Sequence, residues 1–304
     1  MVSIIIPTYN RSTFLRKTLE QVLRQTCPSY EVIVIDQTAE HPEEIARYLA
    51  SIQNLIRYER LCPPSSTRSR NLGLQRASGE VIVCIDDDVD IPCDFISRHL
   101  KNYEDPQICA VAGRIVDERT RGRVEPRRCG AITWYGRVIP NFHATRRTHV
   151  DHGRGANLSF RRERALRCGG FDERIGGNGL RDDTDFSIRY LKAGSGRMVF
   201  DPEATLFHHV APSGGCRVED QGLDPLAYAN ELYFLLKHFS KWLFPYFLVN
   251  LFVRFFLMRA CIRHFNAWRD IPRKIQTMTG GLRIGVGLYR AYRKGGRNLG
   301  GSGR

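Results

Sequence analysis

Residues 81–90, VIVCIDDDVD, place three aspartates directly after a short apolar run. The run VIVCI (81–85) is rich in β-branched residues and follows Gly79-Glu80, which is typical of a strand buried on both faces of a parallel sheet. Adjacent carboxylates at the end of such a strand repel one another and are partly desolvated. A divalent cation would relieve that repulsion, and the carboxyl edge of an open α/β sheet is where ligands bind. The alternative is an acidic loop that happens to follow a strand.

Strand and helix patterns alternate on both sides of this run over the first 110 residues. Ser66 or Thr67 is expected to cap the helix before the run. The alternation predicts an α/β fold with a doubly wound, mostly parallel, Rossmann-like sheet. The other expected strands are 2–6, 31–36, 55–60 and 108–116, and the expected helices are 11–24, 42–51, 66–77 and 94–103.

The pattern becomes irregular over residues 118–152, which are rich in Arg, Gly and Pro and indicate a long functional loop. Regular structure is expected again with GANLSF (155–160) and a helix from about 161 to 168. A further helix begins near Asp182, and strands are expected over 197–200 and 204–210.

Charge and cysteine content narrow the class of protein. The net charge is +14, and residues 242–304 hold 12 Lys/Arg and one acidic residue, so most of the positive charge belongs to the tail. Nine scattered cysteines without a CxxC pair argue against a disulfide framework or a zinc site, and favour a reducing cytosol. No GxxxxGK[ST] loop occurs, which argues against a P-loop nucleotide triphosphatase.

The tail also contains an apolar, aromatic stretch, residues 242–262. Pro245, Asn250, Arg254 and Arg259 interrupt it, whereas a transmembrane helix needs about 20 predominantly apolar residues. An interfacial or re-entrant amphipathic segment with its basic residues against anionic headgroups is one interpretation. A soluble helical subdomain that covers one side of the sheet is the other.

The order of the motifs carries a family resemblance. IIIPTYNR, VIVID, RSRNLGLQRASGE and VCIDDDVDIP are followed by GANLSFRRE, GGFDE, RDDTDFSIRYLKAG and FHHVAPSGGCR. In this order they resemble glycosyltransferase family 2 over about residues 1–215. The resemblance implies a GT-A fold over 1–225, with a nucleotide-sugar half (1–117) and an acceptor half (118–225). Residues 226–304 would form a helical, basic, amphipathic, membrane-associating region.

The resemblance also implies roles for individual residues. Asp36 ends the second strand, where its carboxylate could accept a hydrogen bond from a nucleotide base or a ribose hydroxyl, or could cap the following helix. By similarity, Asp183 is favoured as general base over its neighbour Asp182, since many relatives have Glu-Asp where this chain has Asp-Asp. The implied nucleotide-sugar site comprises Pro7, Thr8, Asp36, Arg70, Asp86 and Asp87, and the implied ligands of Mg²⁺ or Mn²⁺ are Asp88, Asp86 and His208.

The expected activity is inverting transfer of a sugar from a UDP-linked donor to a glycan or lipid-linked acceptor. It combines a metal-assisted single displacement with a carboxylate general base. The expected location is the cytoplasm, peripheral on the inner face of the cytoplasmic membrane. Two alternatives are a sugar-phosphate nucleotidyltransferase, which would normally have a glycine-rich basic loop after the first strand, and a basic-tailed nucleic-acid-binding protein. The aromatic and aliphatic tail fits a bilayer better than a phosphate backbone, so no nucleic-acid partner is expected.

Overall fold

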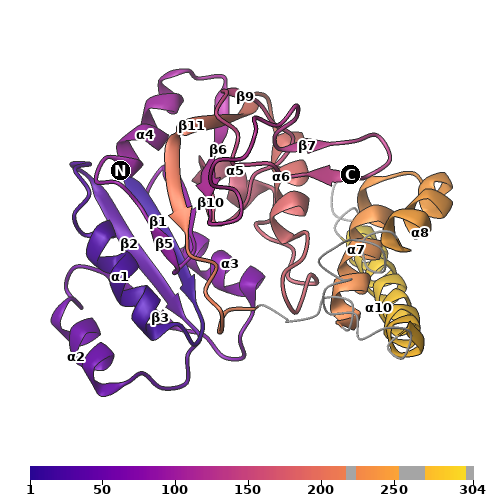
Figure 1. The fold of residues 1–304 in the computed structure, drawn as a ribbon, viewed down its shortest axis with the longest axis horizontal. Helices are drawn as coiled ribbons and strands as arrows, with labels where there is room; N and C mark the ends of the chain where they lie inside the picture. Colours follow the sequence, from indigo (N-terminus) through magenta and orange to yellow (C-terminus); the bar gives the residue numbers. More distant parts are fainter. Residues whose placement is uncertain (217–223, 253–270, 299–304) are drawn as a thin grey trace. The chain divides into compact units, whose positions relative to one another are not determined.

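The computed structural model describes residues 1–216, 224–252 and 271–298 (Figure 1). Parts of the predicted tail segments, residues 253–270 and 299–304, lie outside the described residues. The chain forms two compact units. Unit 1 comprises Met1–Ile132, Val138–Glu173 and Asp182–Cys216, and unit 2 comprises Thr133–Arg137, Arg174–Arg181 and Arg217–Arg304.

The elements follow one another as strands and helices in the first unit and as helices at the end of the chain. The strands are β1 (Val2–Thr8), β2 (Tyr30–Asp36), β3 (Arg57–Arg60), β4 (Val81–Ile85), β5 (Val89–Asp90), β6 (Ile108–Val116), β7 (Ala131–Ile132), β8 (Val138–Ile139), β9 (Thr148–His149), β10 (Asn157–Arg161) and β11 (Arg197–His208). The helices are α1 (Ser12–Val22), α2 (Glu43–Ser51), α3 (Ser66–Arg76), α4 (Phe95–Lys101), η1 (Asn102–Glu104), α5 (Arg162–Arg167), α6 (Asp182–Lys192), α7 (Pro225–His238), η3 (Lys241–Leu243), α8 (Phe244–Phe252) and α10 (Ile271–Asn298).

One mixed sheet forms the centre of unit 1, in the order β3-β2-β1-β4-β10-β6-β11-β5, with β9 pairing beside β11. The pairs β3-β2, β2-β1, β1-β4 and β6-β11 are parallel, whereas β10 runs antiparallel between β4 and β6. The predicted α/β class with a mostly parallel sheet is confirmed. All five residues of β4 are buried, as the apolar run 81–85 predicts, and β4 lies inside the sheet between β1 and β10.

Three local expectations need correction. Ser65, not Ser66 or Thr67, caps α3, because its hydroxyl accepts the hydrogen bond from the Arg68 N–H. The predicted loop 118–152 contains the short strands β7, β8 and β9. The two strands expected over 197–210 are one strand, β11, whose register against β6 shifts between Asp201 and Thr205.

A buried polar cluster holds this irregular part of the sheet together. The Asn157 side-chain amide, on β10, donates to the Arg114 and Ala204 carbonyls at 2.9 Å each. These carbonyls belong to β6 and β11, next to the point where the register of the two strands shifts. The Asn157 side-chain oxygen lies 2.8 Å from Nε2 of His99 on α4, and His99 Nδ1 lies 2.9 Å from the Ser159 hydroxyl. Burial lowers the pKa of His99 to about 4, although the Asn157 contact opposes the shift.

His99 is expected to make unfolding depend on pH. Its pKa is lower in the folded chain than the ordinary value of 6.5, so the unfolded state binds more protons as pH falls through this window. The contribution of His99 is complete above pH ~6.5 and declines toward pH ~4, by about 2 kcal/mol between pH 7 and pH 5. Urea unfolding of wild type and His99→Gln at both pH values measures it. An equal pH-dependent loss in both proteins would contradict this role.

Unit 2 is built around a pair of packed helices, α7 and α10. A Cβ atom on Gly281 would lie 2.3 Å from the Pro225 carbonyl oxygen, and one on Gly285 would lie 2.8 Å from the Ala229 carbonyl oxygen. The two glycines therefore allow the helix backbones to approach closely. Phe247 of α8 joins the apolar core that Tyr228 and Leu232 form on α7. In the part of the chain that the structure describes, no helix is both long enough and apolar enough to span a membrane.

Candidate active site

Asp88 is the most firmly held of the three aspartates that follow β4. Its side chain is fully buried, and its Oδ2 accepts a 2.8 Å hydrogen bond from the Ala211 N–H. Its Oδ1 lies 3.0 Å from His208 Nε2 at the end of β11. Burial alone would raise the pKa of Asp88, but His208, the Arg11 guanidinium and the Ala211 N–H outweigh it and hold the pKa well below its usual range. Asp88 is therefore a permanent carboxylate.

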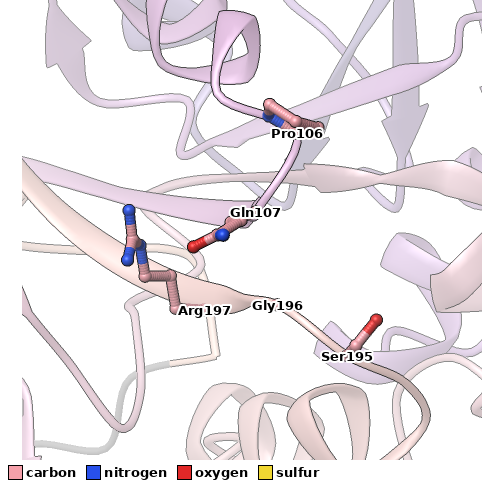
Figure 2. A pocket seen from close by; sticks show the side chains of 5 residues that line it. All are labelled: Pro106, Gln107, Ser195, Gly196 and Arg197. Carbon is pink, nitrogen blue, oxygen red and sulfur yellow. The ribbon is translucent and has the colours of Figure 1, made fainter.

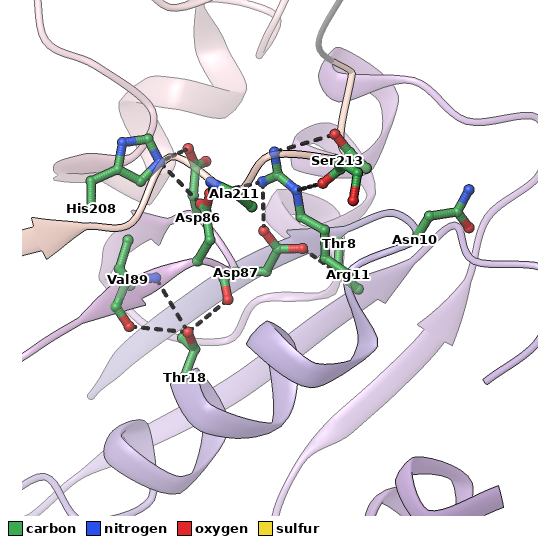
Figure 3. A network of polar contacts seen from close by, with 12 residues as sticks. Thr8, Asn10, Arg11, Thr18, Asp86, Asp87, Val89, His208, Ala211 and Ser213 are labelled. Carbon is green, nitrogen blue, oxygen red and sulfur yellow. Dashed lines mark hydrogen bonds and ion pairs between the residues drawn. The ribbon is translucent and has the colours of Figure 1, made fainter. Parts of the chain in front are cut away.

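Asp87 shares Arg11 with Asp88 and also contacts Thr8 (Figure 3). Its Oδ2 accepts from the Thr8 hydroxyl at 2.6 Å, and its Oδ1 lies 3.0 Å from the Arg11 guanidinium. Arg11 also donates to the carbonyls of Ser213 and Gly214, at 3.2 and 3.3 Å. Burial raises the pKa of Asp87 to about 6, although Arg11 opposes the shift. Asp87 and Arg11 thus join the end of β1 to the segment that follows β11.

Asp86 keeps the most exposed carboxylate of the three, with 26% of its side-chain surface accessible. Its Oδ2 lies 3.6 Å from His208 Nε2, and its Oδ1 lies 3.6 Å from Arg70. Asp86, Asp88 and His208 each offer a ligand atom, and these three atoms lie within 4.8 Å of one another. Two carboxylate oxygens and an imidazole nitrogen suit Mn²⁺ or Mg²⁺, with one carboxylate open to solvent. The donor set fits the predicted metal.

Arg70 connects this cluster with Asp182, which with Asp183 forms the pair of candidates for the general base. Its guanidinium lies 2.7 Å from Asp182 Oδ2, and the Ser66 hydroxyl donates to the same oxygen at 2.8 Å. The Asp183 N–H donates to Asp182 Oδ1 at 2.6 Å. Both carboxylate oxygens of Asp182 are therefore engaged. Burial raises the pKa of Asp182 to about 6, although Arg70 opposes the shift.

Asp183 differs from Asp182 in exposure and in its contacts. Its side chain is half-buried, and among the described residues its Oδ1 accepts a long 3.2 Å hydrogen bond from the Thr184 hydroxyl. Both aspartates begin α6, where acidic residues are favoured by the helix dipole. Of the two, Asp183 has the carboxylate with fewer hydrogen bonds to other described residues.

Asp36 ends β2 and is surrounded by hydrogen-bond donors. Its Oδ1 accepts from the Thr38 N–H at 2.7 Å, and its Oδ2 contacts the Tyr58 hydroxyl and His41 Nε2. His41 Nδ1 in turn lies 2.7 Å from the Ser12 hydroxyl. Burial and the Asp36 contact raise the pKa of Tyr58 to about 12. Asp36 does not cap α2, whose preceding residue is Pro42, so the helix-cap interpretation is wrong.

The structure thus places the predicted residues along one edge of the sheet. Pro7 and Thr8 end β1, Asp36 ends the neighbouring β2, and the three aspartates follow β4 on the other side of β1. Sequence reasoning assigned no role to Arg11, His41 or Tyr58. Arg11 belongs to the motif IIIPTYNR, which is a signal for it, whereas His41 and Tyr58 lie in segments without a motif.

A shallow pocket elsewhere in unit 1 lacks such groups (Figure 2). It is lined by Pro106, Gln107, Ser195, Gly196 and Arg197, at the amino ends of β6 and β11. Arg197, its charged residue, pairs with Asp105 at 2.8 Å. The pocket offers no carboxylate or imidazole and is not the candidate active site.

Comparison with known proteins agrees with this arrangement. Residues 3–169, more than half of the chain, match the profile of Glycosyl transferase family 2. The chain is 25% identical over 217 residues to the glucosyl-dolichyl phosphate glucuronosyltransferase of Haloferax volcanii, covering 68% of each protein. Two solved structures share the fold. The first, S. aureus TarS 1–349 in complex with UDP-GlcNAc, has a TM-score of 0.60 at 14% identity, covering 97% of this chain and 92% of TarS. The second, the mannosyltransferase PcManGT of Pyrobaculum calidifontis with GDP-Man and Mn²⁺, has a TM-score of 0.56 at 18% identity, covering 95% of this chain and 86% of PcManGT.

Proposed function

Because the chain belongs to glycosyl transferase family 2, a family of enzymes, we propose that it moves a sugar from a nucleotide-sugar donor to an acceptor hydroxyl with inversion at the anomeric carbon. The observation that carries this proposal is the convergence of Asp86, Asp88 and His208 at the edge of the sheet that also holds Arg70 and Asp183. Two carboxylates and an imidazole can ligate the divalent cation that binds the diphosphate of the donor. A separate carboxylate can act as the general base.

The donor diphosphate would lie against Asp86 and Arg70. Asp86, Asp88 and His208 would hold Mn²⁺ or Mg²⁺, which when bound neutralises the charge that builds on the leaving diphosphate. Arg70 is buried, and burial would lower its pKa, but Asp182 and Asp86 outweigh that effect and raise it. Its guanidinium therefore stays charged and can donate to phosphate oxygens. Asp87 supports this site through Arg11 and Thr8, beside the nucleotide.

The nucleotide base of the donor would lie at the ends of β1 and β2, near Pro7, Thr8 and Asp36. A carboxylate has about four positions for accepting hydrogen bonds. Thr38, His41 and Tyr58 occupy three of those of Asp36. The Asp36 side chain is fully buried, so it would hold His41 and Tyr58 in place beside the nucleotide base. We propose a UDP-linked donor, as the family resemblance implies.

Asp183 would remove the proton from the acceptor hydroxyl as attack proceeds. Attack from the face opposite the leaving diphosphate gives single displacement and inversion, and Asp183 acts without a covalent intermediate. Asp182, whose oxygens are taken by Arg70, Ser66 and the Asp183 N–H, would instead position Arg70.

The acceptor would be a glycan or a lipid-linked sugar. The name of the Haloferax volcanii relative describes a lipid-linked sugar phosphate, and the basic tail suits an anionic membrane. We assign donor binding to residues 1–117, acceptor binding to 118–225 and membrane association to 226–304. The protein would act in the cytoplasm, at the inner face of the membrane, without a nucleic-acid partner.

A donor screen tests this function. The protein is mixed with Mn²⁺ and either UDP-glucose, UDP-N-acetylglucosamine or GDP-mannose, and its thermal unfolding is recorded. We expect a UDP-sugar to raise the unfolding temperature only when Mn²⁺ is present, and to be hydrolysed slowly to UDP. Release of pyrophosphate from a nucleoside triphosphate and a sugar phosphate would instead identify a nucleotidyltransferase. A shift with GDP-mannose alone would contradict the uracil assignment.

A further inference from the structure

Helix α8 of unit 2 presents large apolar side chains to solvent. Trp242, which precedes it, is 92% exposed, Tyr246 is 55% exposed and Val249 is 62% exposed. Phe244 is also exposed, whereas Phe247 is 6% exposed and packs in the core of the unit. The helix therefore packs through one side and, within the part of the chain that the structure describes, exposes an apolar side. Large exposed apolar patches mark interaction sites.

A segment more than 100 residues earlier extends this surface. The turn between β7 and β8 is closed by the Thr133 N–H, which donates to the Arg137 carbonyl at 2.9 Å. Trp134, within this turn, is 72% exposed. Its ring centroid lies 6.2 Å from that of Tyr246, and the ring of Tyr135 lies 5.5 Å from the same tyrosine. We call Trp134, Tyr135, Trp242, Phe244, Tyr246 and Val249 the aromatic face.

The charge of unit 2 restricts what can cover this face. Helix α10, which packs on α7 in the same unit, contains seven basic residues and no acidic residue. Arg283, Arg290 and Arg293 are among its exposed residues. A second copy of the chain would add its own net charge of +14 to the assembly, whereas an anionic lipid surface complements the positive charge.

We propose that the aromatic face lies in the interface of an anionic bilayer, with α8 in the plane of the membrane. Trp and Tyr rings are amphipathic and accumulate at headgroup level, and aliphatic side chains such as Val249 enter the acyl boundary. An acceptor glycan is a less suitable occupant, because Val249 offers a sugar neither a ring for stacking nor a hydrogen bond. The inference rests on the proposed membrane location and adds the turn at Trp134, which lies outside the tail, to the membrane contact.

Vesicle binding of the full-length protein tests this inference. The vesicles contain phosphatidylcholine with about 30% phosphatidylglycerol, and a second set carries bromine on the acyl chains. We expect the wild type to float with the vesicles and its tryptophan fluorescence to be quenched by the brominated lipid. The double variant Trp134→Ser/Trp242→Ser is expected to bind at least about tenfold more weakly and to lose most of the quenching.

The matched control is Leu55→Ser/Val124→Ser, which removes two apolar side chains of unit 1 that are 62% and 88% exposed. It is expected to bind vesicles as the wild type does. Equal binding by the Trp134/Trp242 variant, or binding that about 1 M NaCl reverses completely without any quenching, would overturn the inference. Hydrolysis of the UDP-sugar donor is measured on the same preparations. If no preparation hydrolyses a donor, the proposed enzymatic function fails, but flotation and quenching still decide the membrane contact.

Discussion

Asp88→Asn is expected to lower metal-stimulated turnover of the donor by at least about a thousandfold. The substitution keeps an oxygen that can accept from the Ala211 N–H, but it removes the charge that faces His208 and Arg11. The remaining Asp86 and His208 form a weaker site, so the apparent affinity for Mn²⁺ should fall by at least about a hundredfold. Steady-state donor hydrolysis at a series of Mn²⁺ concentrations measures both effects.

Asp90→Asn is the matched control for this prediction. Asp90 lies two residues further along the same segment, is half exposed, and contacts His209 and Gln21. Asp90 is not one of the proposed metal ligands, so the Asp90→Asn variant should keep the turnover and metal affinity of the wild type. Circular dichroism and thermal unfolding of both variants show whether the fold is retained. A folded Asp88→Asn protein with wild-type turnover would remove the metal assignment.

Asp183→Asn should lower sugar transfer by about a hundred- to ten-thousandfold, the range that general-base catalysis typically contributes. The donor KM and the donor-dependent thermal shift should stay unchanged, because Asp183 contacts neither Arg70 nor the metal-ligand cluster in the described contacts. Transfer of radiolabelled sugar to an acceptor, compared with donor binding by thermal shift, separates the two effects.

Asp182→Asn provides the contrast. Its carboxylate holds Arg70 at 2.7 Å in a buried pair, so the loss of charge leaves the Arg70 guanidinium without its nearest carboxylate partner. We expect weaker donor binding and lower stability in this variant, with transfer reduced in proportion to donor binding. If Asp182→Asn eliminates transfer with donor binding intact, while Asp183→Asn transfers normally, then Asp182 is the base.

Local sequence patterns predicted the parts of the fold that depend on burial along one segment. The runs at 81–85 and 108–116 became β4 and β6 with the same bounds, because period and apolarity determine a buried strand. The antiparallel direction of β10 was not predictable in this way, since the residues of GANLSF pair with partners 46 to 78 residues distant. Short strands such as β7 and β9 contain only two residues each, too few for any periodicity.

In the candidate site, too, local motifs predicted some residues, whereas others depend on the folded chain. The motif order led to Asp86, Asp88 and His208, which the structure brings within 4.8 Å of one another. The partners of Asp87 and Asp36 were not predictable, because they depend on side chains that only the folded sheet edge brings together, such as Arg11 and Tyr58. The different environments of Asp182 and Asp183 also appear only in three dimensions, since both begin the same helix.

The contacts of Asp88 and Arg11 have a consequence for how the protein acquires activity during synthesis. Asp88 is held by Ala211, and Arg11 donates to Ser213 and Gly214. A nascent chain that has emerged from the ribosome only as far as α5 already contains all three aspartates but lacks the backbone groups that fix them. Domains generally fold as units, and β11 belongs to the same sheet, so the donor site stays incomplete until β11 and the residues after it arrive. A fragment ending before β11 should therefore bind no donor.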